Sequence, residues 1–573
     1  RGELVALFGE SGSGKTTISL SALGYCKSGL TFAGGEALLL GQDVTRMPTE
    51  ELRPVRGAKV AYLAQSAAAT FNPSILINEQ VTEAPILHGT KTQAEADAKA
   101  LSLYHALELP DPENIGTRYP HQVSGGQLQR LMAAMALCGE PDLLVLDEPT
   151  TALDVTTQIE VLKAFKKVIK EEGAAAIYVT HDLAVVAQVA DHIVVLYNGE
   201  IKEAGPVETI INKSEHPYTK RLMGAIKPLP KAGLGEASNH AHMRDVPALE
   251  AKSVDAGYGR DSEGKPKTMV LRDVNVAIER GKTVGIIGES GCGKSTLARV
   301  FAGLLPPSDG HLKLDGESIA PDLRNRSREE LRKVQFVYQM ADTALNPRQR
   351  IKDIIGRPLE FYGGLTGAAK NKRLLELLEM VELPPAFAER YPHELSGGQK
   401  QRVNLARALA ADPEVVLCDE VTSALDTIVG ANVIELLKTL RRDTGVSFVF
   451  ISHDLSTVAS FADEIVVLYA GRVAEQGPTD KVLSPPYHPY TRLLISSVPE
   501  MRTGWLEDTI ASKETITGMS GGVELTDTGC PFFARCPLAI EGTCDTQAPP
   551  RRVDGDDHVI ECHREVNELL GGG

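Results

Sequence analysis

The stretch GESGSGKTT, at residues 9–17, follows the short apolar run LVALF. Its pattern is Gly9-x4-Gly14-Lys15-Thr16. Glycines let successive backbone N–H groups turn inward around phosphate oxygens, and a helix that starts at such a loop adds its dipole. The lysine would reach the β- and γ-phosphates of a nucleotide, and the following hydroxyl would bind Mg²⁺. The stretch therefore predicts a phosphate-binding loop between a strand and a helix.

The same stretch occurs a second time, as GESGCGKST at residues 288–296. Four more motifs recur in the same order. These are YPHQVSGGQLQR at 119 and YPHELSGGQKQR at 391, LLVLDEPTTALD at 143 and VVLCDEVTSALD at 415, YVTHDLAVVA at 178 and FISHDLSTVA at 450, and HPYTKRL at 216 and HPYTRLL at 488. Ordered recurrence of this kind indicates that a whole domain is duplicated rather than one motif.

The repeat sets the expected domain boundaries. We predict a first domain at 1–227, a linker at 228–247, a second domain at 248–499 and a cysteine-rich C-terminal extension at 500–573. The linker is rich in Pro, Gly, Ala and Ser and lacks apolar periodicity. Because Lys15 lies close to the start of the chain, we expect the first domain to lack its opening strands and the chain to be a fragment.

Composition and apolar patterns predict an α/β fold. The 573 residues are 42% apolar and 24% charged, which is typical of globular proteins. Runs such as LLVLD, AIYVTH and HIVVLY are continuously apolar, as in strands that are buried on both faces of a mainly parallel sheet. After Ser124, the residues Leu128, Leu131, Met132 and Met135 mark one face of a helix whose N-cap would be Ser124.

Charge and hydropathy limit the classes of function. No run approaches the ~20 apolar residues that a membrane-spanning helix needs, so we expect a membrane role only through partner proteins. The net charge of −16 disfavours a nucleic-acid-binding surface. A disulfide framework is improbable in a reducing cytosol, so clustered cysteines favour metal binding.

Two acidic pairs follow buried strands, once in each repeat. Asp147 and Asp419 end these strands, where a carboxylate would hold Mg²⁺ directly or through water. Glu148 and Glu420 come next, and an adjacent carboxylate can polarise the water that attacks a γ-phosphate. The same pair following a phosphate loop twice predicts two hydrolytic sites.

Taken in order, the phosphate loop, SGGQ, DEP, ALD and THD resemble the nucleotide-binding domain of the ABC ATPases over nearly all of residues 1–500. In that family two domains pair head to tail, and each ATP lies between one phosphate loop and the opposite SGGQ signature. The resemblance implies that Lys15 shares its nucleotide with the signature at 396–398, and that Lys294 shares its nucleotide with the signature at 124–126. It predicts two tandem domains, each with a mainly parallel sheet and a helical signature subdomain, plus a small cysteine-rich tail.

The resemblance also assigns individual roles. Gln65 and Gln339 resemble the glutamines that sense the γ-phosphate and Mg²⁺, His181 and His453 resemble the switch histidines, and Tyr258 resembles the aromatic residue that stacks on adenine. The implied ATP-binding residues are Gly9, Ser11, Gly12, Gly14, Lys15, Thr16, Thr17, Gln65, Ser124, Gly125, Gly126, Gln127 and Asp147, then Tyr258, Gly288, Ser290, Gly291, Gly293, Lys294, Ser295, Thr296, Gln339, Ser396, Gly397, Gly398, Gln399 and Asp419. The implied Mg²⁺ ligands are Thr16, Gln65, Asp147, Ser295, Gln339 and Asp419. With Glu148, Glu420, His181 and His453 all present, we expect both sites to hydrolyse ATP.

Further motifs favour a transporter over a soluble ATPase that acts on ribosomes or nucleic acid. HPYT after each core, TFNPS and ALNPR after each glutamine, and the C-terminal cysteines together resemble the fused ATPases of the oligopeptide/dipeptide importers. That resemblance implies two membrane permease subunits, an extracytoplasmic substrate-binding protein reached through them, no nucleic acid, and a peripheral location on the cytoplasmic face of the inner membrane. The transported substrate cannot be inferred from this chain.

The tail cysteines Cys530, Cys536, Cys544 and Cys562 have the spacing C-x5-C-x7-C-x17-C. The close pairs typical of structural zinc are missing from this spacing. Four thiolates can also hold a [4Fe–4S] cluster, and the tail is similar to a segment that binds one in the peptide-importer ATPases. An iron–sulfur cluster, zinc, or four buried small side chains therefore all stay open, with the cluster favoured.

Overall fold

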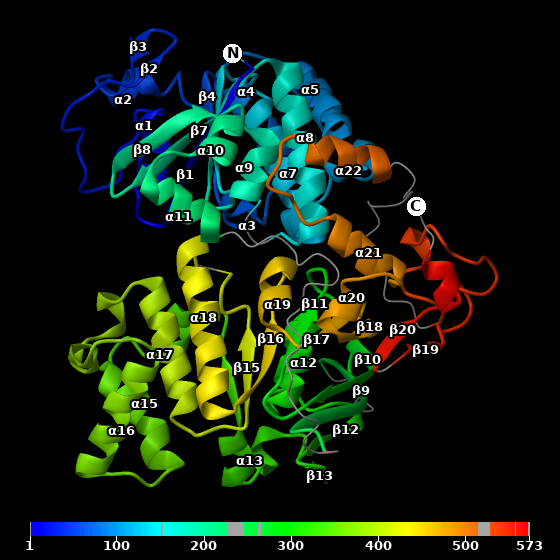
Figure 1. Ribbon diagram of the computed structural model, residues 1–573. Helices are drawn as coiled ribbons and strands as arrows, with labels where there is room; N and C mark the ends of the chain where they lie inside the picture. The colour runs from blue at the N-terminus through cyan, green and yellow to red at the C-terminus, as the bar shows by residue number, and fades with distance from the viewer. Residues whose placement is uncertain are drawn as a thin grey trace. The chain divides into compact units, whose positions relative to one another are not determined.

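The computed structural model describes residues 2–150, 153–225, 246–259, 261, 265–423, 425–513, 528–555 and 557–570. The chain divides into two compact units. The first comprises Arg1–Ile226 and Pro499–Glu514, and the second comprises Lys227–Val498 and Thr515–Gly573. Figure 1 shows the secondary-structure elements of both. Most of the predicted linker, residues 228–245, lies outside the described residues.

In the first unit, six strands form one sheet in the order β4-β5-β6-β1-β7-β8. The strands are β1 (Leu4–Gly9), β4 (Val60–Leu63), β5 (Leu143–Asp147), β6 (Ala175–Thr180), β7 (His192–Tyr197) and β8 (Glu200–Pro206). All neighbours are parallel except β7 and β8. Because parallel strands end at the same edge, the segments that follow β1, β5 and β6 meet there.

The second unit repeats this sheet and extends it, in the order β14-β15-β16-β11-β17-β18-β20-β19. The strands are β11 (Thr283–Ile287), β14 (Val334–Val337), β15 (Val415–Asp419), β16 (Ser447–Ile451), β17 (Glu464–Tyr469), β18 (Arg472–Pro478), β19 (Arg551–Asp554) and β20 (His558–Glu561). The strands from β14 to β17 are parallel, and the last three join antiparallel. The α/β fold with a mainly parallel sheet is therefore confirmed in both repeats.

The remaining strands form two smaller antiparallel sheets. One has the order β10-β9-β12-β13, formed by β9 (Leu249–Tyr258), β10 (Thr268–Ile278), β12 (Asp309–Leu314) and β13 (Glu317–Ser318). The other pairs β2 (Leu38–Leu39) with β3 (Gln42–Asp43). In the second unit, buried side chains of the larger sheet and of the β9 sheet form one hydrophobic core around α12 (Lys294–Phe301).

Helices cover the sheets in a repeated order. The first unit has α1 (Lys15–Ser21), α2 (Thr49–Leu52), α3 (Ala67–Thr70), α4 (Ile77–Leu87), α5 (Gln93–Ala106), α6 (Pro112–Ile115), α7 (Gly125–Leu137), α8 (Val155–Glu172), α9 (Leu183–Val189), α10 (Val207–Lys213) and α11 (Pro217–Ala225). The second has α13 (Arg328–Lys333), α14 (Ala341–Ala344), α15 (Ile351–Phe361), α16 (Gly367–Met380), α17 (Gly397–Leu409), α18 (Thr427–Thr444), α19 (Leu455–Phe461), α20 (Thr479–Val482) and α21 (Pro489–Ser496). Figure 1 shows α15, α16 and α17 grouped to one side of the second sheet, as a helical subdomain. No described helix combines the length and the apolar character that a bilayer crossing requires.

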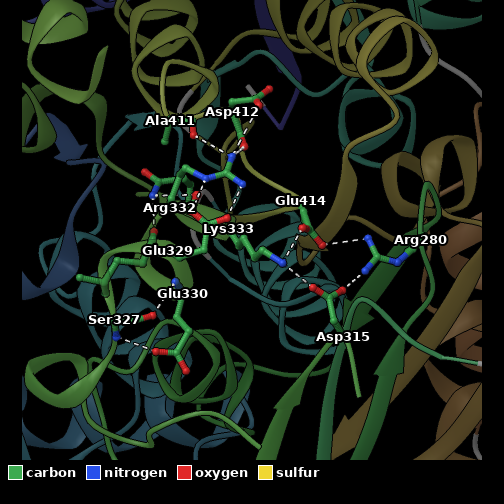
Figure 2. Close-up of polar contacts among 12 residues, drawn as sticks. Arg280, Asp315, Ser327, Glu329, Glu330, Arg332, Lys333, Ala411, Asp412 and Glu414 are labelled. Carbon is green, nitrogen blue, oxygen red and sulfur yellow. Dashed lines mark hydrogen bonds and ion pairs between the residues drawn. The ribbon is translucent and has the colours of Figure 1, made fainter. Parts of the chain in front are cut away.

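A charged network ties the two sheets of the second unit together (Figure 2). Lys333 Nζ lies 2.6 Å from Asp315 and 2.9 Å from Glu414, and Arg280 binds the same two carboxylates. Asp315 follows β12 of the smaller sheet, and Glu414 precedes β15 of the larger one. Burial alone would raise the pKa of Glu414, but the hydrogen bonds from Lys333 and Arg280 hold it below its usual value.

The C-terminal residues are divided between the two units. Helix α22 (Trp505–Lys513) belongs to the first unit, where Trp505 and Leu506 are buried. Gln188 of α9 donates its amide to the carbonyls of Glu500 and Arg502 at 2.7 and 2.9 Å, and it accepts from the Leu506 N–H at 3.1 Å. The residues after 527 instead join the second unit, where β20 pairs with β18.

The packing of the Pro499–Glu514 segment within the first unit can be measured directly, because Trp505 is the only tryptophan in the chain. Gln188→Ala leaves three backbone groups of the segment without their partner, at a cost of about 1–3 kcal/mol. We expect Trp505 fluorescence to shift to longer wavelength at lower urea in Gln188→Ala than in the parent chain. The matched control, Lys163→Ala, removes only an exposed ion pair with Glu108. An unchanged Trp505 transition in Gln188→Ala would contradict this role for the glutamine.

Candidate functional site

Each phosphate loop holds its lysine beneath the end of a central strand. The lysine Nζ donates to two loop carbonyls: Lys15 to Gly9 and Glu10 at 2.7 and 2.9 Å, and Lys294 to Gly288 and Glu289 at 2.7 and 2.9 Å. Both lysines are buried. Gly14 and Gly293 are the N-caps of the following helices at φ of 95° and 109°, a left-handed conformation that favours glycine.

Two of the three predicted Mg²⁺ ligands lie in contact in each repeat, whereas the third, Gln65 or Gln339, donates to the neighbouring glutamate. Thr16 Oγ1 donates to Asp147 at 3.2 Å, and Ser295 Oγ donates to Asp419 at 2.9 Å. Burial raises the pKa of both aspartates, so each carboxylate pays a desolvation cost that a bound cation would offset. The first site has one further donor, because the Tyr62 hydroxyl donates to Asp147 at 2.8 Å.

In the first repeat, three predicted side chains converge at the end of β5. Gln65 Nε2 donates to Glu148 Oε2 at 2.9 Å, and His181 Nδ1 lies 3.0 Å from Glu148 Oε1. Burial alone would lower the pKa of His181, but the hydrogen bond and charge of Glu148 outweigh it and raise that pKa. Glu148 has φ of 50°, a left-handed conformation that is costly for a residue with a side chain and is found at functional sites.

The second repeat reproduces this arrangement. Gln339 Nε2 donates to Glu420 at 2.6 Å, His453 Nδ1 lies 3.9 Å from Glu420, and Glu420 has φ of 49°. Contact with His453 holds the pKa of Glu420 below its usual value. This carboxylate is therefore ionised at neutral pH, as a group that accepts a proton from water must be.

The signature residues begin helices, as the sequence predicts. Ser124 is the N-cap of α7 and Ser396 is the N-cap of α17, each in a capping box with the glutamine three residues later. A Cβ on Gly126 would lie 2.3 Å from Thr157 Cγ2, and one on Gly398 would lie 2.4 Å from Val429 Cγ1. The second glycine of each signature thus permits close packing of α7 on α8 and of α17 on α18.

Tyr258 lies beside the second loop's helix. Its hydroxyl is 3.2 Å from Thr296 Oγ1 and accepts from Arg299 Nη1 at 2.9 Å, and the side chain is 38% exposed. An exposed ring that is anchored by its hydroxyl at this position is available for stacking.

The repeated HPYT motif supports both phosphate loops. His216 Nδ1 and His488 Nδ1 each accept the N–H of the tyrosine two residues later, at 3.1 Å. That tyrosine's hydroxyl then accepts a loop N–H: Tyr218 from Glu10 at 3.4 Å, and Tyr490 from Glu289 at 2.8 Å. From the sequence, this motif contributed only to the resemblance to the importer ATPases. Its contact with the phosphate loops was not predicted.

Two further neighbours of the sites were not predicted. Tyr62, which donates to Asp147, stands where the repeat alignment places Phe336, so comparing the two repeats could have found it. Arg299, one turn after Ser295, holds Tyr258. Its partner comes from the β9 sheet, so no local spacing could have indicated this contact.

The four tail cysteines are free thiols in the second unit, and Cys544 and Cys562 are buried. Burial, followed by the charges of the neighbouring cysteines, raises the pKa of Cys530 to about 11 and that of Cys536 to about 12. Among the described residues, no group of three or more His, Cys, Asp or Glu side chains is arranged as a metal site.

Comparison with known proteins identifies the family. The sequence matches the family described as ABC transporter at residues 1–151 and 271–423, so the chain belongs to the ABC transporter family, as an ATP-hydrolysing subunit. Residues 203–246 and 474–544 match the oligopeptide/dipeptide transporter C-terminal region, which assigns the chain to the peptide-importer group. The importer interpretation is confirmed over the ribosomal one.

Curated relatives are similar to the chain over most of its length. Glutathione import ATP-binding protein GsiA of Escherichia coli (strain K12) is 36% identical over 531 residues, which cover 87% of this chain and 85% of that protein. The GsiA of Salmonella choleraesuis (strain SC-B67) is 36% identical over 533 residues, with the same coverage. Among solved structures, a dimeric ATP-binding cassette with ADP and Pi is 35% identical and covers 40% of this chain and 98% of that chain, with a TM-score of 0.36.

The two glutamates give a direct test of the site. Loss of a group that activates water typically costs about 10²–10⁴-fold in rate. We expect Glu148→Gln and Glu420→Gln each to remove the turnover of its own site, measured as phosphate release, and the double variant to show the full loss. Glu140→Gln, which alters only a carboxylate paired with Lys91 and Lys99, should leave turnover unchanged. Full turnover in either site variant would show that the site in question does not hydrolyse ATP.

Proposed function

We propose that the chain carries two hydrolytic ATP sites, one at each phosphate loop, and that they power import of peptides or related small solutes through separate permease subunits. The observation that carries this proposal is that both repeats hold the same set of groups in contact. Each has a loop lysine, a hydroxyl on an aspartate, and a glutamate at positive φ that lies beside both a glutamine and a histidine.

The groups divide the chemistry between them. The loop N–H groups and lysine would bind the β- and γ-phosphates, and Mg²⁺, held through Thr16 with Asp147 or Ser295 with Asp419, would neutralise charge on them. Glu148 or Glu420 would accept a proton from the attacking water, while the histidine and glutamine orient the γ-phosphate and the water. The pairing of each loop with the other repeat's signature stays a prediction.

The names of two relatives support a proposal for the class of substrate. The curated proteins with 36% identity are named for glutathione import, and glutathione is a small peptide. We propose that small peptides of this kind are the substrate class, delivered by an extracytoplasmic binding protein, with the ATPase on the cytoplasmic face of the inner membrane.

Reconstitution tests this proposal. We expect the chain to co-purify with two integral-membrane permease subunits, and the reconstituted complex to increase ATP turnover when a loaded extracytoplasmic binding protein is added. Glutathione and dipeptides to pentapeptides are the probes, and a sugar of similar size is the control. Co-purification with ribosomes, or stimulation by the sugar alone, would contradict the proposal.

For the tail we propose a structural metal centre held by Cys530, Cys536, Cys544 and Cys562, with a [4Fe–4S] cluster favoured over zinc. The donor set supports it: four thiols lie in one short segment, and burial, together with the charges of neighbouring thiols, raises the pKa of Cys530, Cys536 and Cys562. The Cys530 N–H also donates to the Cys544 carbonyl at 2.6 Å, which brings two of these residues together. A bound cation would offset the cost of ionising buried thiols. It would also hold together a segment that has only a small hydrophobic core around Ile560.

Anaerobic purification distinguishes the possibilities. We expect a brown protein with broad visible absorbance and about four irons per chain, the content of one [4Fe–4S] cluster. Cys536→Ser should lose both signals, whereas Cys26→Ser, at a cysteine outside the tail, should keep them. A colourless protein with stoichiometric zinc, or with no bound metal, would contradict the cluster.

A further inference from the structure

The segment between Cys530 and Cys536 places two side chains beneath the second phosphate loop. Phe532 is 1% exposed, and its ring centroid lies 5.1 Å from that of Tyr469 and 5.5 Å from that of Tyr490. The Arg535 guanidinium lies 5.7 Å from the centroid of the Tyr469 ring and 5.6 Å from that of Phe532. Aromatic packing therefore fixes where this arginine points.

Arg535 forms a two-pronged ion pair with Glu289 of the phosphate loop. Its Nη1 and Nη2 donate to the two carboxylate oxygens at 2.7 and 2.8 Å, and both side chains are 7% exposed. Pairs of this geometry combine strength with a fixed orientation. Removal of Arg535 would take these two charge-assisted hydrogen bonds from a buried carboxylate, so the loop would be expected to rearrange.

The backbone of Glu289 connects this ion pair to the lysine of the loop. Its N–H donates to the Tyr490 hydroxyl at 2.8 Å, and its carbonyl accepts from Lys294 Nζ at 2.9 Å. Arg535 is therefore linked to the lysine ammonium through one residue. A small shift in such a support can misplace reacting groups and cost a large factor in binding or rate.

The first phosphate loop lacks this support among the described residues. Glu10 stands where Glu289 stands in the second loop, but its Oε1 lies 3.6 Å from Arg221 Nη2, and Arg221 is 60% exposed. That Oε1 is buried without a hydrogen bond. The hydrogen bond from the Glu10 N–H to Tyr218 is also longer, at 3.4 Å. The two loops thus share one chemistry but differ in how they are held.

We propose that Arg535 is a positioning residue for the second ATP site: through Glu289 it holds Lys294 where the phosphates bind, so this site, but not the first, depends on the C-terminal segment. The inference rests on the proposed role of the Lys294 loop as an ATP site. It gives the cysteine segment a physical connection to nucleotide binding that does not require a cysteine at the site.

Binding of a fluorescent ATP analogue with Mg²⁺, measured on the full chain, tests the proposal one site at a time. Lys15→Ala isolates the second site, and Lys294→Ala isolates the first. In the Lys15→Ala background, we expect Arg535→Gln to raise the Kd roughly tenfold, within the range for residues that act on a site without touching its ligand. In the Lys294→Ala background the Kd should change less than about twofold.

A double-mutant cycle and a control separate positioning from general damage. Because Arg535→Gln and Glu289→Gln remove the same pair, the double variant should bind no more weakly than either single variant. Arg535→Lys keeps the positive charge but cannot donate two parallel hydrogen bonds to the Glu289 carboxylate, so it should give an intermediate Kd. Arg564→Gln, which loses the hydrogen bond to the Leu538 carbonyl and the ion pair with Glu568 elsewhere in the tail, should leave both sites unchanged.

Three results would overturn the inference: an unchanged second-site Kd in Arg535→Gln, equal weakening of both sites, or the same effect from Arg564→Gln. If Arg535→Gln does not fold, Arg535→Lys decides, because a second-site Kd equal to that of the parent chain would refute the role. If instead Lys294→Ala leaves the second site's binding intact, the assignment of that site fails, and this outcome is distinct from failure of Arg535.

Discussion

The structure depends above all on a buried lysine ammonium at the end of each central strand. A charge that is taken out of water must be hydrogen-bonded, and here the partners are carbonyls of the loop itself, Gly9 and Glu10 in the first repeat. The loop can present them only because glycine adopts the left-handed conformation where the helix begins. The strand, the loop and the helix are therefore fixed together, and the charge that would bind phosphate is in place beforehand.

The parallel sheet brings the remaining chemistry to the same edge. Strands β1, β5 and β6 end side by side, so the lysine, the acidic pair and the histidine meet although they are far apart in the chain. The duplicated sheet repeats this, and Glu148 and Glu420 share the same strained backbone. The two repeats differ in the residues that support these groups from outside. Tyr62 donates to the first aspartate, and Arg535 supports only the second loop.

Much of this was predictable, because phosphate chemistry demands particular residues at fixed spacing. The loops, the strand-end carboxylates and the Ser124 cap all followed from local sequence. The supports did not, because they join segments far apart in the chain: Arg535 and Glu289 are 246 residues apart. Nor could sequence show that residues 500–573 divide, with α22 in the first unit and β20 beside β18, since both depend on tertiary packing.

Counting the nucleotides bound to each chain tests whether one chain holds two ATP sites. The Glu148→Gln/Glu420→Gln variant retains both loops and their lysines but should not turn ATP over. Equilibrium dialysis of this variant with labelled ATP and Mg²⁺ should reach two nucleotides per chain, falling to one when either loop lysine is also replaced. Saturation at one nucleotide per chain would contradict the account.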